Sequence, residues 1–283
     1  MKRIYIIFIL VLIIGALFGE IYLPKDASLK EKVVFVVEKG QGSRDIAFNL
    51  EKEGLIRFSP IFRVYVLTIG VSGKLQAGDY SLSPTMSISE IVKKLAVGDI
   101  VREKITIIEG WDLKEIGFYF ENRGMFQAEE LYDEMSDLEG YLFPDTYWVR
   151  RGETLKEITE RMQSNFEKKT EGLEITPDII TMASLLEREL QIKEDKEIAA
   201  GVLWKRLSVG MALQVDAFPW TYENQGLPLS PICNPGLESI EAAAYPKESQ
   251  YWYYLSTPEG ETIFSKTLEE HNIAKFKYLK SNE

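Results

Sequence analysis

The chain has 283 residues, 45% of them hydrophobic, which is enough for roughly two domains of ordinary size. It carries 44 acidic and 33 basic residues, a net charge of -11, so it is a poor candidate for binding a nucleic-acid backbone. A single cysteine and a single histidine exclude an intramolecular disulfide, a thiolate zinc cluster and a multi-histidine metal site. If the chain is an enzyme, we expect its proton chemistry to depend on carboxylates, with no metal or organic cofactor.

The N-terminal segment is apolar almost without interruption from Ile4 to Phe18, and apolar residues continue to Leu23. About 20 such residues are what a helix needs to cross the hydrocarbon core of a bilayer. Lys2 and Arg3 precede the run, which predicts a single-pass span of the cytoplasmic membrane with the N-terminus in the cytoplasm and the rest outside. A cleaved signal peptide is the alternative, although the run offers only a poor cleavage site. The exported part is acidic, so we expect it not to bind anionic lipid beyond its anchor.

The first half of the chain predicts short strands and amphipathic helices separated by glycines. The expected strands are residues 33–37, 77–82 and 105–108, and the expected helices are residues 43–50, 60–69, 87–97 and 112–122. An internal similarity appears at a shift of 70 residues, which places Gly40 on Gly110 and Gly54 on Gly124. We interpret it as two related βα units, and chance similarity between two amphipathic helices is the alternative.

The second half predicts longer helices followed by loops. Helices are expected at residues 154–168, 176–191 and 195–207, and a strand at residues 251–256. Between these segments the chain is rich in proline, glycine and aromatic residues. We place a domain boundary near residue 103.

Glu187 stands out in the helix predicted at residues 176–191. On a helical wheel it falls within the apolar stripe, whereas Glu189 points toward the polar side. Burial disfavours a charged carboxylate, and a glutamic acid that keeps its proton near neutral pH is what general-acid catalysis requires. The alternative is a structural glutamate at the edge of the stripe, solvated or paired with Arg188 or Lys205.

Other chemical signals are weaker. His271 lies near the end of a predicted short helix, and no G-x-S-x-G elbow accompanies it, so a packing or surface role is favoured over a catalytic base. Residues 251–254 are all aromatic, and strand alternation predicts that two of them are core. The others, with Trp220 or Trp148, are candidates for a platform under sugar rings, and core or lid packing is the alternative.

Ordered motifs along the second half resemble those of the endolytic murein transglycosylase (YceG-like) family. They are E-G-Y-L-F-P-D-T-Y at residues 139–147, A-S-L-L-E-R-E at 183–189, V-L-W-K-R-L at 202–207, G-M-A-L-Q-V-D at 210–216, G-L-P at 226–228, P-I-C-N-P-G at 231–236 and E-H-N at 270–272. The resemblance covers nearly the whole chain, including the apolar N-terminus. Several motifs in order are far more specific than any one of them.

The resemblance implies an α+β fold. Residues 1–23 would be the cytoplasmic stub and transmembrane helix, residues 30–103 a LysM-like βα module, and residues 104–283 a mixed α/β catalytic domain. The family's acid is the first glutamate of its E-x-E string, which falls on Glu187, the residue that the helical wheel also sets apart.

The implied reaction is cleavage of the β-1,4 bond between N-acetylmuramic acid and N-acetylglucosamine in nascent peptidoglycan strands. A lytic transglycosylase needs one carboxyl group, because the C6 hydroxyl of the muramic acid attacks. Glu187 would protonate the leaving oxygen and then accept the C6 proton, giving a 1,6-anhydro end. The implied partners are the glycan strands, the membrane through the N-terminal helix, and cell-wall synthases.

Further residues follow from the same resemblance. We expect Gln214, Asp216 and Asn234 to position sugar or N-acetyl groups, although Asp216 is equally suited to cap a turn. Glu139 is another substrate-binding candidate, and with Asp145 it is equally suited to orient the acid or to fix the domain junction.

The chain also departs from the family pattern. It passes from Tyr222 to Gly226 almost directly where the family has a longer segment, it reads A-F-P after Asp216 where a P-T-V type string is usual, and Thr262 replaces a histidine. These departures affect the expected shape of the subsites and the cut position more than the acid.

Two alternatives stay open: a non-catalytic, membrane-anchored peptidoglycan-binding scaffold, and a muramidase-type hydrolase that uses Glu187 with Asp216.

Overall fold

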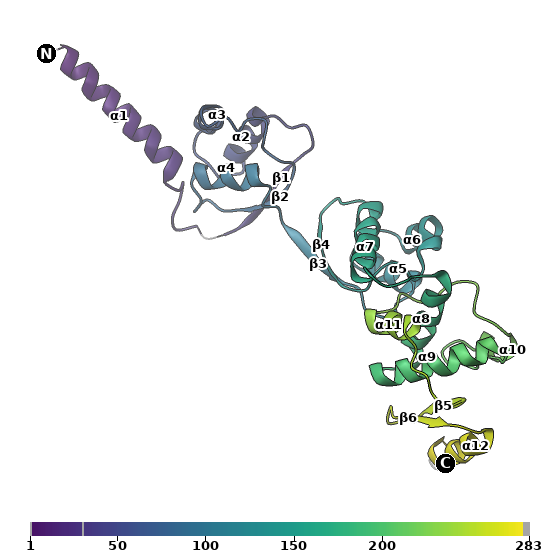
Figure 1. The fold of residues 1–283 in the computed structure, drawn as a ribbon. Helices are drawn as coiled ribbons and strands as arrows, with labels where there is room; N and C mark the ends of the chain where they lie inside the picture. The colour runs from purple at the N-terminus through teal and green to yellow at the C-terminus, as the bar shows by residue number, and fades with distance from the viewer. Residues whose placement is uncertain (1, 30, 280–283) are drawn as a thin grey trace. The chain divides into compact units, whose positions relative to one another are not determined.

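The computed structural model describes residues 2–29 and 31–279, and it combines helices with short strands (Figure 1). The elements are α1 (Lys2–Tyr22), β1 (Val33–Val37), α2 (Ser43–Lys52), α3 (Ser59–Thr68), β2 (Gly78–Leu82), α4 (Ile88–Val97), β3 (Arg102–Thr106), α5 (Leu113–Asn122), α6 (Ala128–Met135), η1 (Ser136–Leu138), β4 (Thr146–Arg150), α7 (Leu155–Lys169), α8 (Pro177–Glu189), α9 (Lys193–Ser208), α10 (Trp220–Glu223), α11 (Leu237–Ala244), β5 (Tyr253–Ser256), β6 (Thr262–Ser265) and α12 (Leu268–Leu279). Within the described residues the strands form the pairs β1–β2, β3–β4 and β5–β6. The chain divides into two compact units, Met1–Lys104 with Trp148–Glu153, and Ile105–Tyr147 with Thr154–Glu283.

The first unit is built on the antiparallel pair β1–β2. Phe35 of β1 lies opposite Tyr80 of β2, and both side chains are buried. Their alternate neighbours Val34 and Val36 are exposed, as expected for a sheet with one covered face. Helices α2, α3 and α4 supply most of the rest of this core, together with Leu55 and Ile56 from the turn between α2 and α3.

Helix α1 is the membrane-span candidate. Residues Ile4–Tyr22 are long and apolar enough to cross a bilayer, and their side chains are not buried in the protein. The same length and composition are found in signal sequences. The helix predicted from the sequence is therefore present, and its membrane topology stays a prediction.

The internal similarity corresponds to two similar pieces of structure. The order β1–α2–α3–β2 is repeated after α4 as β3–α5–α6–β4, with the short η1 before β4, and α5 begins and ends 70 residues after α2. Gly40 and Gly110, which precede these helices, have φ angles of 87° and 82°. These left-handed values favour glycine, which explains why the shift aligns glycine with glycine.

The second unit has its core where α8, α9 and α11 pack together. Helix α8 contributes Ile180, Ala183 and Leu186, which are fully buried. Thr176 caps the helix by accepting a hydrogen bond from the N–H of Ile179, and a proline stands at the first helical position. The start signal predicted from the sequence is therefore confirmed.

Candidate active site

Glu187 lies at the C-terminal end of α8, with its side chain only 9% exposed. Its Oε1 accepts a hydrogen bond from Lys196 Nζ at 3.1 Å. Its Oε2 accepts hydrogen bonds from the N–H of Gly236 and the hydroxyl of Ser239, each at 2.8 Å. The carboxylate is thus fixed from both sides by donors that belong to α9 and to the beginning of α11.

Lys196 makes a buried ion pair with Glu187, because its side chain is 4% exposed. A buried charge is costly unless it is paired, so each of the two residues depends on the other. The sequence analysis missed Lys196 and named Arg188 or Lys205 as the alternative partner of Glu187, which is wrong. A signal was available, since Lys196 lies three and four residues before the buried Ala199 and Ala200 on α9.

The first turn of α11 forms the other side of the site. Gly236 is its N-cap residue, so the Glu187 carboxylate lies at a helix N-terminus, where the backbone dipole favours a negative charge. A side chain at position 236 would collide with the carboxylate of Glu109. Glycine at this position therefore lets both carboxylates approach the same backbone.

Glu109 is a second carboxylate in this site, and the sequence analysis missed it. Its pKa is raised, mainly by burial and further by the negative charge of Glu187. At the equivalent position of the first repeat, 70 residues earlier, the chain has Lys39. The change from this lysine to a glutamate in the second repeat was the signal that could have identified Glu109.

Glu189 does not lie on a solvated face as the helical wheel predicts. Its Oε2 accepts the N–H of Ala217 at 3.0 Å, and burial raises the pKa of its carboxyl group. The prediction was wrong because the loop that follows α9 covers this side of α8. Both glutamates of the E-R-E string are therefore partly buried.

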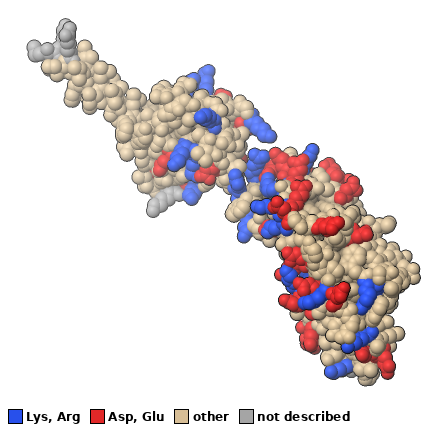
Figure 2. Space-filling view, viewed as in Figure 1, with Lys and Arg blue, Asp and Glu red and all other residues tan. Residues whose placement is uncertain are grey.

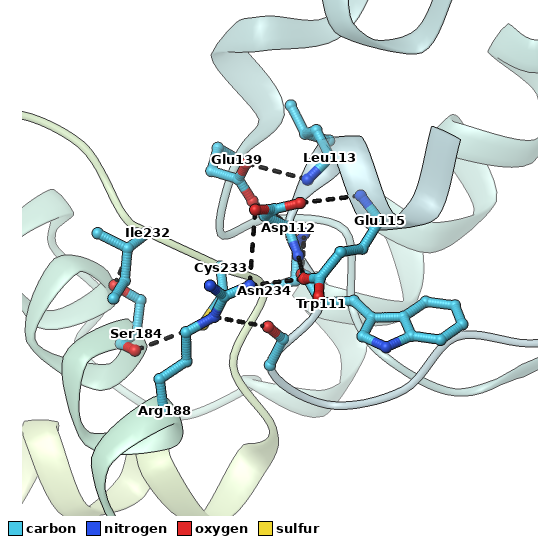
Figure 3. A network of polar contacts seen from close by, with 11 residues as sticks. Trp111, Asp112, Leu113, Glu115, Glu139, Ser184, Arg188, Ile232, Cys233 and Asn234 are labelled. Carbon is cyan, nitrogen blue, oxygen red and sulfur yellow. Dashed lines mark hydrogen bonds and ion pairs between the residues drawn. The ribbon is translucent and has the colours of Figure 1, made fainter. Parts of the chain in front are cut away.

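Arg188, the next residue in the chain, takes part in a different network, drawn in Figure 3. Its Nη2 donates to Glu115 Oε2 at 2.6 Å and its Nε to the carbonyl of Gly110 at 3.0 Å. Asp112 caps α5 in the same network, with Glu115 closing the capping box. Arg188 thus connects α8 to the turn that carries Glu109.

Asn234 is the centre of that network and is completely buried. Its Oδ1 accepts the N–H groups of Gly140 and Leu142 at 3.0 and 2.9 Å. Its Nδ2 donates to the carbonyl of Trp111 at 3.0 Å and to Glu139 Oε1 at 3.1 Å. The predicted contact of Asn234 with sugar is therefore corrected: its amide is used to hold three loops together.

Glu139 lies partly buried beside Asn234, and its Oε2 accepts the N–H of Leu113 in the first turn of α5. Burial raises its pKa to about 7. Asp145 lies a few residues on and accepts a hydrogen bond from Asn165 at 3.1 Å. These contacts support the alternative in which both carboxylates fix the structure around the acid.

Gln214 and Asp216 are exposed in the loop between α9 and α10. Gln214 has a φ of 54°, a left-handed conformation that is uncommon outside glycine and is enriched at functional sites. Asp216 accepts a hydrogen bond from the hydroxyl of Tyr222. Both side chains remain accessible, and substrate binding by them stays a prediction.

A cavity of about 550 Å³ opens on the same unit. It is lined by Asp112, Lys114, Tyr132, Glu139, Arg188, Ala217, Phe218, Trp220, Pro228, Leu229, Ser230, Pro231 and Ile232. The rings of Phe218 and Trp220 lie 6.1 Å apart in its wall. Of the two tryptophans named as platform candidates, Trp220 lines this cavity, whereas Trp148 belongs to the first unit.

His271 is the fourth residue of α12, near its beginning rather than near the end of a helix as predicted. Its ring stacks on Tyr253 at 5.3 Å, and burial lowers its pKa. These contacts support a packing role. Of the aromatic residues 251–254, Tyr254 is the one that is buried, where two were expected.

Comparison with known proteins gives consistent results over the whole chain. The model of the YceG-like family matches residues 35–218 and 219–277. A protein of Bacillus subtilis named endolytic murein transglycosylase is 32% identical, over 95% of this chain and 92% of its own length. A protein of the same name from Streptococcus pneumoniae is 26% identical over 98% of this chain, which spans 65% of that longer protein. The crystal structure of a YceG-like protein from Listeria monocytogenes is 30% identical, with a TM-score of 0.54 over 87% of this chain and 100% of the other.

Proposed function

The chain belongs to the YceG-like family, and on that premise we propose that it is an endolytic lytic transglycosylase acting on peptidoglycan glycan strands. The observation that carries the proposal is the fixed carboxylate of Glu187, held between Lys196, Gly236 and Ser239. Glu187 is also the position on which the family's acid falls. Sequence and geometry therefore favour the same residue.

In the proposed reaction, Glu187 first protonates the oxygen that leaves the cleaved bond between N-acetylmuramic acid and N-acetylglucosamine. The C6 hydroxyl of the muramic acid then attacks C1, and its proton passes to the Glu187 carboxylate, which closes the 1,6-anhydro ring. Lys196 and the donors of α11 stabilise the carboxylate between the two steps. Two donors hold Oε2, and Lys196 holds Oε1, so we assign Oε1, the oxygen with fewer donors, to the substrate.

A muramidase-type hydrolase is the second candidate, because such enzymes use two carboxylates. The sequence analysis named Asp216 as the partner of Glu187 for this reaction. In the structure the carboxylate that lies against the Glu187 site is Glu109, and Asp216 is bonded to Tyr222. If the protein is a hydrolase, we therefore propose Glu109, and not Asp216, as its second carboxylate.

Digestion of purified glycan strands by the full-length protein tests these alternatives. Mass spectrometry should detect 1,6-anhydro ends with the wild type and no cleavage with Glu187→Gln. Glu194→Gln, on the exposed face of α9, is the matched control and should cleave as the wild type does. Reducing ends one water heavier would support the hydrolase, and uncut strands would support the scaffold. Full cleavage by Glu187→Gln would contradict the assignment of the acid.

The first unit is the part of the chain from which we propose where the reaction takes place and how the glycan is held. We propose that α1 anchors the chain in the cytoplasmic membrane with the N-terminus in the cytoplasm, so that the site acts outside, near cell-wall synthases. We also propose that residues 30–103 form a LysM-like, glycan-binding module. The order β1–α2–α3–β2 with antiparallel strands is compatible with that proposal.

A further inference from the structure

Residues 54–78 differ in composition from the rest of this acidic chain. The segment contains Arg57, Arg63 and Lys74 but no aspartate or glutamate, although the whole chain has 44 acidic residues. In Figure 2, acidic side chains are denser on the second unit, whereas the first unit shows much uncharged surface with scattered basic and acidic side chains. The negative charge that should repel anionic lipid is therefore unevenly distributed.

Helix α3, which lies in this segment, is apolar on its outer face as well as its inner face. Phe62 and Val66 are buried in the core of the first unit. On the outer face Val64 and Leu67, which are neighbours at a spacing of three residues, are 61% and 60% exposed. Phe58, which caps the helix, and Ile69, which follows it, are exposed at its two ends. A water-facing helix normally carries polar residues there.

Helix α3 lies beside the end of the predicted membrane span. The ring of Tyr65 on α3 is 6.2 Å from the ring of Tyr22, the last residue of α1. Arg57 reaches the same point, because its Nη1 lies 3.4 Å from Glu20 Oε1 and its Nη2 donates to the carbonyl of Pro24 at 3.2 Å. Helix α3 is thus held beside the end of α1, where the chain would leave the bilayer.

We propose that the outer face of α3, which carries Val64 and Leu67, lies in the headgroup region of the membrane that α1 spans. The inference rests on the anchor part of the proposed function. An amphipathic surface with basic residues at its border binds lipid interfaces by burying apolar side chains while the cations stay among the headgroups. Arg63, exposed between the apolar residues, is placed for such a contact.

This contact would limit how the first unit moves relative to the bilayer. A single helix followed by a short linker would let the unit tumble, whereas a second contact fixes one face toward the lipid. Val34 and Val36, on the outer face of the β1–β2 sheet, are also exposed and apolar. They provide the matched comparison for α3.

The test uses the full-length protein in vesicles of phosphatidylglycerol and phosphatidylcholine. A fluorescent maleimide probe is attached to Leu67→Cys and, as control, to Val34→Cys. The native Cys233 does not compete, because it is buried and burial raises the pKa of its thiol to about 12. Quenching by spin-labelled lipid is compared with quenching by iodide in the water.

We expect spin-labelled lipid to quench the probe at position 67 at least about twofold more strongly than the probe at position 34, with the reverse order for iodide. Adding Arg63→Glu should reduce the lipid quenching at position 67 in vesicles rich in phosphatidylglycerol. Equal lipid quenching at the two positions would overturn the proposal. Protection from iodide that depends on protein density, without lipid quenching, would also overturn it and indicate a second copy of the chain.

The anchor is tested in the same samples by flotation. Protein that does not float with the vesicles after alkaline washing would contradict the membrane span of α1. Protein that floats but shows equal quenching at positions 34 and 67 would contradict only the contact of α3. The two failures are therefore distinguishable.

Discussion

Lys196 and Glu187 form a buried ion pair in which Nζ lies 3.1 Å from Oε1. The side chains are 4% and 9% exposed, so neither charge has much access to water. Removal of one partner from such a pair leaves a buried charge without compensation, which costs more than removal of both. The pair therefore makes the stability of the protein depend on the candidate catalytic residue.

Substitution Lys196→Met should destabilise the protein by about 3 kcal/mol and abolish glycan cleavage. The double variant Lys196→Met with Glu187→Gln should recover much of the stability, because it no longer contains an unpaired buried charge. Thermal unfolding of both variants in detergent, followed by circular dichroism, measures the effect. A single variant as stable as the wild type would show that the pair contributes nothing.

Substitution Ser239→Ala removes one of the donors to Glu187 Oε2. We expect the turnover number to fall about tenfold with little change in KM, because the hydroxyl orients the acid and does not bind the remote sugars. Ser208→Ala, at the exposed end of α9, is the control for loss of a hydroxyl. Steady-state kinetics on soluble glycan strands separates the two parameters, and a rise in KM alone would place Ser239 in substrate binding instead.

Local signals along the chain were sufficient to predict α8, which carries Glu187, and several of the other helices. The capping residues Ser87, Asp112 and Thr154 each begin a helix in the structure, with both hydrogen bonds of a capping box formed. The periodicity of α8 identified Glu187 as a partly buried carboxylate. These features depend on residues within a few positions of one another.

Features that depend on distant segments were not predicted. Helix α11, strand β4 and helix α6 are only eight, five and eight residues long, so their existence depends on the core against which they pack. The donors of Glu187 come from positions 196, 236 and 239, and their convergence cannot be read from spacing. Strand β3 was expected at residues 105–108 and occupies Arg102–Thr106, because its pairing with β4 sets its limits.

Substitution Glu109→Gln distinguishes the two reaction types. If Glu187 acts alone, the variant should still give 1,6-anhydro ends, because a lytic transglycosylase does not need a second carboxylate, whereas a hydrolase does. Product analysis by mass spectrometry of the digested glycan strands measures the effect. The hydrolase would be favoured if the Glu109→Gln variant cut no strands and the wild type gave reducing ends.

Glu139 should make the stability of the protein depend on pH. Burial raises its pKa from 4.5 to about 7, so the folded state binds a proton more tightly than the unfolded state does. Its contribution is therefore fully favourable below pH 4.5 and is lost as the pH rises toward 7, by at most about 3 kcal/mol. Glu139→Gln cannot ionise, and its melting temperature should fall less than that of the wild type between these pH values. If the melting temperatures of the two proteins changed with pH in the same way, ionisation of Glu139 would not destabilise the folded state, which contradicts the prediction.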